Sequence, residues 1–270
     1  FVLGRRTQWR NFPLAPETNF AGIVKDFGRK GYRRYWHGVG MYFEQDKFGM
    51  FNTKIFYGTY AIRLKLAKKT YLSFGLAVGT KTVEINNSLY NILDPALTSR
   101  SGKVLLYPDL VPGVYFYSRK LTMGISVKNL YKNSLKQGNQ QIGTPTKLIP
   151  ITYITASRKF RSSNYDYTIV PAVQIQSTFT SIPLPQFNCM VYYRKNTGIG
   201  LTYRMHDAVT AIIQLRLFGN LVISFAYDYT ISKFRAGAAN STEIMFGYVA
   251  SDGNEYEGGA NVAQCPKFDY

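Results

Sequence analysis

The sequence predicts an all-β protein: a closed antiparallel transmembrane β-barrel of the outer-membrane type, with about 14 strands and a non-strand C-terminal tail. Three observations predict it. Apolar and polar residues alternate with a period of two in many segments, 16% of the residues are aromatic with Tyr 22 and Phe 18, and long links alternate with shorter ones. No apolar run approaches the roughly 18–20 residues that a spanning helix needs, which excludes a helical membrane protein.

The alternation is clearest in 208–248. Between 221 and 229, Ile223, Phe225 and Tyr227 fall on one face, and Ser224 and Asp228 fall on the other. A period of two is typical of a strand with one apolar side. The segments before and after it repeat the pattern, so the predicted apolar side is continuous across three strands.

The same pattern predicts fourteen strands, an even number that suits a closed up-and-down barrel. They are expected at 1–9, 18–25, 35–45, 53–66, 71–83, 110–117, 121–130, 149–160, 165–178, 186–193, 198–205, 208–218, 221–229 and 241–249. We therefore predict a single barrel over 1–249 and a periplasmic tail over 250–270.

Residues opposite the apolar side are small in several strands, for example Gly38, Gly40, Ser73 and Gly75. Glycine repeated on one face favours close packing or tight curvature inside a barrel. Charged residues in the same phase are expected to share the lumen: Arg63, Lys65, Arg204, Arg216 and Glu243. The sequence thus predicts a partly packed lumen. A Tyr-rich soluble β-sandwich is the alternative.

The links differ in length and charge. The longest, 84–109 and 131–148, fall with 230–240 on the side that we assign to the outside, and tight turns fall on the periplasmic side, as in outer-membrane barrels. A sandwich has no reason to separate its loops in this way. Basic residues gather at the periplasmic links and form a predicted basic rim: Arg29, Lys30, Arg33, Arg34, Lys68, Lys69, Arg119, Lys120, Arg158, Lys159, Arg161, Arg194 and Lys195.

The basic rim explains much of the net charge of +18. Two interpretations stay open: contact with the headgroups of outer-membrane lipid, or a docking surface for an acidic partner. Nucleic-acid binding is disfavoured, because no nucleic-acid motif is present and the charges are spread around a ring.

Residues for catalysis are scarce. The two histidines are His37, expected at the membrane interface, and His206, expected in a turn. No Ser, His and Asp combination and no phosphate loop stands out, so we predict a protein that is not an enzyme and holds no cofactor or metal. Cys189 and Cys265 fit no metal motif; whether they pair is left open.

Short motifs follow one another along nearly the whole chain. They include Gln8-Trp9, Ala15-Pro16, His37-Gly38-Val39-Gly40, Asp46-Lys47-Phe48-Gly49, Leu72-Ser73-Phe74-Gly75-Leu76, Asp94-Pro95-Ala96 and the stretches 112–117 and 124–130. The most specific lie in the last third: Tyr203-Arg204, Asp207-Ala208, 226–232 and 243–248, followed by Cys265-Pro266-Lys267-Phe268. In their shared order they resemble the PorP/SprF family of outer-membrane proteins of the type IX secretion system in Bacteroidota.

The resemblance implies a non-enzymatic component of protein secretion and gliding motility. Its implied partners are exported cargo with a type B C-terminal domain and periplasmic proteins that are PorE-like or PorK/PorN-like. The long outer loops would then meet cargo through candidate residues Asn91, Asp94, Pro95, Tyr107, Asp109, Tyr131, Lys136, Gln140 and Lys147. Two departures from the family are a shortened N-terminal stretch and the high charge, so a partner of the basic rim can be particular to this chain.

Two other functions are weighed against this one. A transport channel of the porin or fatty-acid type fits the small inward residues, although no charged-ring filter is evident. A membrane hydrolase would need a nucleophile and a base, for which His206 is the nearest candidate.

Overall fold

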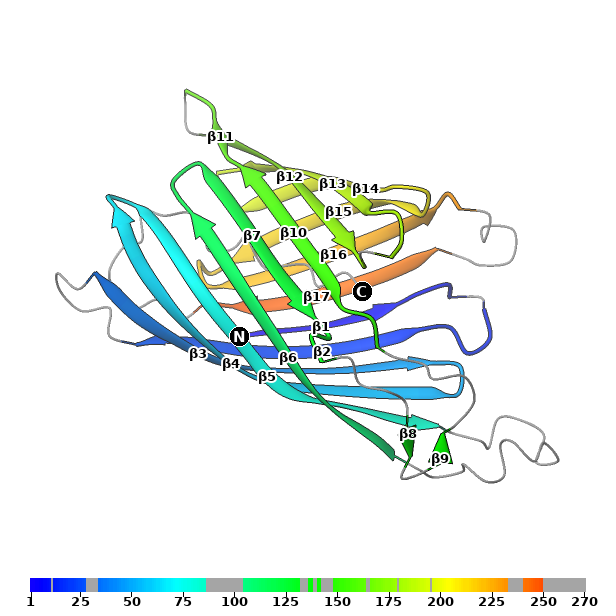
Figure 1. Cartoon of the computed structure of the whole chain (residues 1–270). Helices are drawn as coiled ribbons and strands as arrows, with labels where there is room; N and C mark the ends of the chain where they lie inside the picture. Colours follow the sequence, from blue (N-terminus) through cyan, green and yellow to red (C-terminus); the bar gives the residue numbers. More distant parts are fainter. Residues whose placement is uncertain are drawn as a thin grey trace.

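The structure, a computed structural model, is a single β-barrel (Figure 1). It describes residues 1–10, 12–27, 34–85, 104–131, 136–137, 140–141, 148–163, 166–178, 180–194, 196–232 and 240–249. The strands are β1 (Val2–Thr7), β2 (Glu17–Phe27), β3 (Tyr35–Phe48), β4 (Phe51–Ala67), β5 (Thr70–Ile85), β6 (Val104–Tyr117), β7 (Leu121–Lys128), β8 (Lys136–Gln137), β9 (Gln140–Gln141), β10 (Ile151–Arg158), β11 (Phe160–Arg161), β12 (Tyr167–Ser177), β13 (Leu184–Tyr193), β14 (Thr197–Arg204), β15 (Ala208–Leu217), β16 (Leu221–Thr230) and β17 (Ser241–Tyr248). Within the described part of the chain, no helix is long and apolar enough to cross a membrane.

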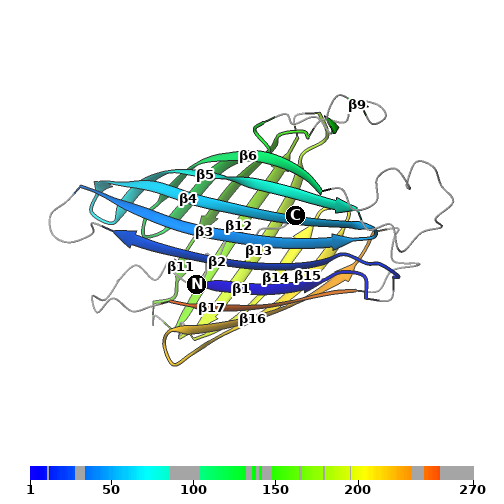
Figure 2. The same ribbon diagram turned by 90° about the horizontal axis from the view of Figure 1, so that it is seen from below.

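The barrel is a closed antiparallel ring. Each strand pairs with its neighbour in sequence, β10 pairs with both β7 and β12, and β1 pairs with β17. The two-residue strand β11 continues β10 past Lys159, and β8 and β9 form a separate small hairpin. Figures 1 and 2 show β1 and β17 side by side at the seam. The predicted closed barrel of fourteen strands is confirmed.

The two ends of the barrel are defined by their links. The rim end holds the links 68–69, 118–120 and 218–220, and the loop end holds 49–50 and 205–207. Since β17 runs in the same direction as β15, which ends at 218–220, it also finishes at the rim end, where the nitrogen of Val249 donates to the carbonyl oxygen of Asn220 at 3.0 Å.

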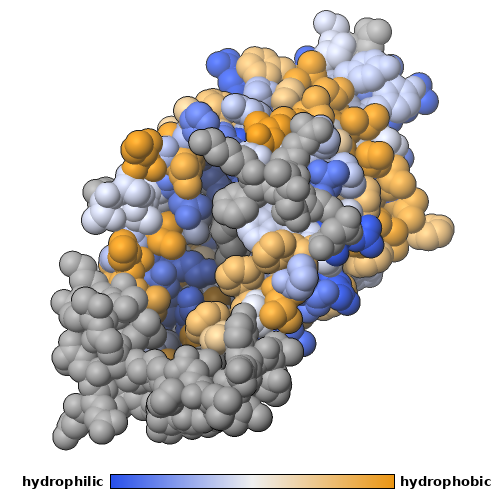
Figure 3. Space-filling model, turned by 90° about the vertical axis from the view of Figure 1, so that its right-hand side faces the viewer, coloured by the Kyte–Doolittle hydropathy of each residue, from blue (hydrophilic) through white to orange (hydrophobic). Residues whose placement is uncertain are grey.

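The outer face of the barrel is apolar, as the alternation predicts. On β16, Phe225, Tyr227 and Tyr229 are exposed while Ala226 and Asp228 are buried. Figure 3 looks onto the loop end and shows hydrophobic residues around the outside of a hollow that has hydrophilic residues within it. A ring of large exposed apolar side chains is stable only against lipid, so this fold is a membrane barrel of the outer-membrane type.

One predicted boundary is wrong. We expected the sixth strand to begin at 110, whereas β6 begins at Val104 and β5 continues to Ile85. Pro108 argues against a strand in the sequence, because proline has no backbone N–H to donate to a neighbouring strand. It is tolerated because β6 pairs with β7 only from Gly113 onward, so the stretch before Gly113 has one open edge.

Two smaller predictions also change. The segment 131–148, expected as a loop, contains the hairpin of β8 and β9. The segment 149–160, expected as one strand, is interrupted at Lys159 between β10 and β11. The tail 250–270 lies outside the described residues.

Tyrosine rings lie against glycines of the neighbouring strand inside the barrel. Three cross-strand pairs share this arrangement: Tyr57 with Gly79, Tyr115 with Gly124, and Tyr192 with Gly198. A Cβ on any of these glycines would come within 2.7 Å of the ring of its partner. An aromatic ring that covers a glycine shields the bare backbone and fixes the register.

Each of two such rings reaches the strand beyond its glycine. Tyr57 on β4 crosses Gly79 and donates to Asp109 Oδ2 on β6 at 2.6 Å. Tyr192 on β13 donates in the same way to Gln214 Oε1 on β15 at 3.1 Å. Each ring thereby ties three adjacent strands together.

Candidate functional site: the basic rim and the lumen

The basic rim lies at one end of the barrel. The nine members that the structure describes all fall at or next to links of the rim end: Arg34, Lys68, Lys69, Arg119, Lys120, Arg158, Lys159, Arg161 and Arg194. The other four, Arg29, Lys30, Arg33 and Lys195, lie outside the described residues. The arrangement makes the rim end strongly positive.

Some basic groups at this end stack on aromatic rings. The guanidinium of Arg158 lies 5.1 Å from the ring centroid of Phe160, and that of Arg194 lies 5.2 Å from that of Tyr193. Lys25 Nζ lies 5.5 Å from the ring of Phe27. A cation over an exposed aromatic ring at the end of a barrel strand suits the boundary between lipid headgroups and hydrocarbon.

Two rim residues have altered acidity. The hydrogen bond to Asp166, 3.2 Å from Arg194 Nε, raises the pKa of Arg194. Burial, together with the positive charge of Arg161, lowers the pKa of Lys159 to about 8. Lys159 therefore loses its charge within an accessible pH range.

This lowered pKa predicts selective modification of Lys159. Amine-reactive reagents attack the neutral amine, and below pH 8 its neutral fraction is roughly two orders of magnitude larger than for a lysine with an ordinary pKa. We expect acylation of Lys159 to rise with pH to a half-maximum near its pKa of about 8, measured by peptide mass spectrometry. In the control variant Arg161→Gln the midpoint should move to higher pH, because a repelling cation is removed. A half-maximum above pH 10 in the unmodified sequence would contradict the prediction.

The lumen near the loop end contains a buried ion-pair network. Arg6 Nη2 and Arg204 Nη2 both donate to Asp228 Oδ2, at 2.8 and 2.7 Å. Glu243 lies 3.9 Å from Arg6, and Asp207 lies 3.0 Å from Arg204. The side chains of Arg6 and Asp228 are only 11% and 9% exposed, so the charges depend on one another for stability.

A second set of polar side chains lies on β2, β3 and β6, next to this network, because Thr18 on β2 pairs with Arg6 on β1. Tyr42 donates to Glu44 Oε2 at 2.6 Å, and Thr18 donates to Asp46 Oδ1 at 2.7 Å. Asp109 on β6 accepts the hydrogen bond from the Tyr57 hydroxyl that is described above. These two groups make the loop half of the lumen a layer of paired charges and hydrogen bonds.

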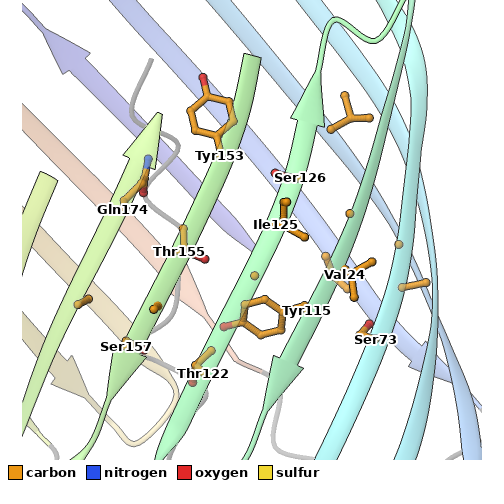
Figure 4. Close-up of a pocket in the computed structure, with 18 of the residues that line it drawn as sticks. Val24, Ser73, Tyr115, Thr122, Ile125, Ser126, Tyr153, Thr155, Ser157 and Gln174 are labelled. Atoms are coloured by element: carbon orange, nitrogen blue, oxygen red, sulfur yellow. The ribbon is translucent and has the colours of Figure 1, made fainter. Parts of the chain in front are cut away.

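On the rim-end side of this layer is a cavity of about 700 Å³. Its wall is formed mainly by small or uncharged side chains, and Figure 4 shows Ser126, Thr155, Tyr115, Tyr153 and Gln174 around it. Tyr192 and Gln214 line it from β13 and β15. Arg63 and Lys128 also line it. A wall made mainly of hydroxyl, amide and small apolar groups suits a small solute.

The predicted lumenal charges divide between the two ends. Arg204 and Glu243 belong to the network near the loop end, whereas Arg63, Lys65 and Arg216 face inward near the rim end. Arg63 is ion-paired with Asp26. The sequence analysis missed Arg6 as a network member, although it holds an inward position in the first strand.

Two predicted cargo-loop residues are corrected. Tyr107 and Asp109 belong to β6, face the lumen and are 5% and 4% exposed, so they do not lie on an outer loop. Of the others, Tyr131 is exposed, and Lys136 and Gln140 fall in β8 and β9. Asn91, Asp94, Pro95 and Lys147 lie outside the described residues.

The structure also places the histidines and one cysteine. His37 faces outward, with its Nδ1 2.7 Å from the hydroxyl of Tyr60, and His206 lies in the turn 205–207 with a φ of 61°. Cys189 is an exposed free thiol on the outward face, and Cys265 lies outside the described residues. Among the described side chains no group of three or more His, Cys, Asp and Glu could hold a metal ion.

Comparison with known proteins shows a family and a fold. The family model for the type IX secretion system membrane protein PorP/SprF matches residues 1–248. No match is found among curated proteins. The structure is similar to the Ralstonia pickettii toluene transporter TbuX, with a TM-score of 0.53, 12% identity, and coverage of 91% of this chain and 86% of that one. A Pseudomonas aeruginosa FadL homologue is matched over 91% and 86% of the two chains, with a TM-score of 0.45 and 10% identity.

Proposed function

Since this chain belongs to the PorP/SprF family of type IX secretion system membrane proteins, we propose that it is a non-enzymatic barrel that links secretion partners across the outer membrane. In this proposal the rim end faces the periplasm and binds PorE-like and PorK/PorN-like proteins. The loop end faces outward and binds exported cargo with a type B C-terminal domain.

The concentration of positive charge at the rim end carries the proposal. Nine described members of the basic rim lie there, whereas the charges in the loop half of the lumen are paired with one another. Unbalanced charge at one end attracts acidic surfaces and speeds their association. The members of the basic rim differ in their surroundings. Arg158 and Arg194 stack on aromatic rings and suit contact with lipid headgroups. Lys68, Arg119 and Lys120 lie in tight links and suit contact with a protein partner.

The test is charge reversal in these links. We expect the triple variant Lys68→Glu, Arg119→Glu, Lys120→Glu to lower the yield of co-purified periplasmic secretion proteins at least about tenfold after mild detergent extraction, because complementary charge becomes repulsive. The matched control reverses Lys47, an exposed residue near the loop end of β3, and should keep the yield. Equal partner yields from the triple variant and the control would rule out these links as the docking surface.

The cavity favours a second candidate function, an outer-membrane transport channel of the porin or fatty-acid type. Its volume of about 700 Å³ is sufficient for a small solute. A swelling assay with the purified barrel in lipid vesicles tests this candidate, which requires uptake of small neutral solutes.

A further inference from the structure

The cavity in the lumen has two walls of different chemistry. On β4, β5 and β6 the wall consists of residues with little side-chain volume, among them Ala61, Gly75, Ala77 and Gly113. The register pairs Ala61 with Gly75 and Gly75 with Gly113, so these residues lie side by side on neighbouring strands. Glycine in a strand often marks a place where a ligand comes close to the backbone. This part of the wall is therefore apolar and leaves room for a bound molecule.

The adjoining wall on β7, β10 and β12 is polar. Ser126, Thr155 and Gln174 line the cavity, and their side chains make no hydrogen bond within the part of the chain that the structure describes. Thr155 is the direct cross-strand partner of Gln174, so the two side chains are neighbours on the inner face. Figure 4 shows all three on these adjacent strands. Their hydroxyl and amide groups are available to a bound molecule.

The cavity carries little free charge. None of the described residues that line it is acidic, and of the two basic ones Arg63 is ion-paired with Asp26 and Lys128 lies at the loop end of β7. Tyr115 on β6 pairs with Gly124 on β7, which places its ring at the border between the apolar and the polar wall. An aromatic ring, an apolar wall and a few hydroxyl and amide groups suit a neutral molecule that has both a C–H face and hydroxyl groups. Sugars have this chemistry.

A second, smaller cavity of about 170 Å³ lies at the loop end, where Arg6, Arg204 and Asp207 of the ion-pair network line it. Gln174 and Gln186 line both cavities, and they are direct cross-strand partners on β12 and β13. These two amide side chains therefore stand between the outer cavity and the main one. Because an amide both donates and accepts hydrogen bonds, the pair can exchange hydrogen bonds with a hydroxylated solute that passes it.

We propose that the main cavity binds a neutral sugar of one or two rings, which enters from the loop end past Gln174 and Gln186. Ser126, Thr155 and Gln174 hydrogen-bond the hydroxyl groups of the sugar, and its C–H face packs against Tyr115 and the small residues of β4–β6. The cavity volume of about 700 Å³ falls within the range of about 300–1,000 Å³ that is usual for ligand sites. Binding depends on the cavity alone, whereas entry rests on the second candidate function, the transport channel.

Binding is measured by saturation-transfer NMR titration of the full-length barrel with maltose, in a detergent that has no sugar headgroup. The double variant Thr155→Val, Gln174→Leu should weaken maltose binding at least about tenfold, because two hydrogen-bonding groups are replaced by apolar groups of similar size. The control Thr168→Val removes a hydroxyl from the same strand as Gln174 at a position outside the cavity wall, and it should keep the affinity. Equal maltose affinity of the double variant and the control, or binding of hexanoate without binding of maltose, would overturn the proposal.

Entry is measured separately, by the swelling of lipid vesicles that contain the barrel. Gln186→Trp should reduce maltose uptake at least about tenfold, because the larger side chain narrows the passage between the two cavities. The control Phe187→Trp changes the neighbouring residue, which is 52% exposed on the outer face, and it should keep the uptake. Uptake that Gln186→Trp leaves unchanged would overturn entry past the glutamine pair. Maltose binding without any uptake by the unmodified barrel would support the binding site and rule out the channel function.

Discussion

The variant Asp228→Ala should lose about 3–5 kcal/mol of unfolding free energy, because it leaves two buried guanidinium groups without their shared counter-ion. Arg6 and Arg204 donate to the same oxygen of Asp228, and their side chains are only 11% and 17% exposed. Urea unfolding of the refolded barrel in lipid vesicles, followed by tryptophan fluorescence, measures the loss.

Two controls make this result specific. Asp166→Ala breaks an ion pair whose side chains are 41% and 66% exposed, and it should leave the unfolding free energy nearly unchanged. Adding Arg204→Met to Asp228→Ala should recover part of the loss, since one uncompensated buried charge disappears. If the two aspartate variants unfold at the same urea concentration, the network does not stabilise the barrel.

The second large effect is expected for Gly79→Ala, which should lower the unfolding free energy by about 1–3 kcal/mol through overpacking. A Cβ at Gly79 would overlap the carbonyl oxygen of Phe56 and approach the ring of Tyr57 to 2.7 Å. Tyr57 would then move away from Asp109, and the hydrogen bond that links β4 to β6 would break. Urea unfolding in lipid vesicles again measures the effect.

Gly58 provides the matched control, because it lies on the outer face of β4 and a Cβ there would find its nearest atom 3.9 Å away. Gly58→Ala should therefore keep the stability or raise it slightly. A loss as large as that of Gly79→Ala would mean that the backbone of β4 and β5, rather than the tyrosine contact, limits substitution.

The sequence was sufficient for the fourteen strands and for which residues face inward, because a period of two reports directly on the side of each residue. Arg204, Arg216 and Glu243 were assigned to the lumen for this reason, and the structure places them there. The start of β6 could not be predicted, because a proline such as Pro108 normally indicates the end of a strand. Only the structure shows that β6 does not pair with β7 before Gly113.

The sequence also could not predict which side chains on neighbouring strands come together. Arg6 and Asp228 are 222 residues apart, and their contact depends on the ring closing between β1 and β17. The Tyr57 and Gly79 pair depends on a register set by the turn at 68–69. Alternation gives the face of each residue but not its neighbour on the next strand.

The seam between β1 and β17 has a consequence for biogenesis. Val2–Thr7 pairs with residues 242–247. The two strands that close the barrel are therefore the first and the last to be synthesised. Until β17 has been synthesised as far as Tyr248, β1 lacks the strand with which it pairs in the closed barrel. Closure of the barrel must therefore follow synthesis of the chain through β17, and until then β1 has an edge that is open to pairing with other chains.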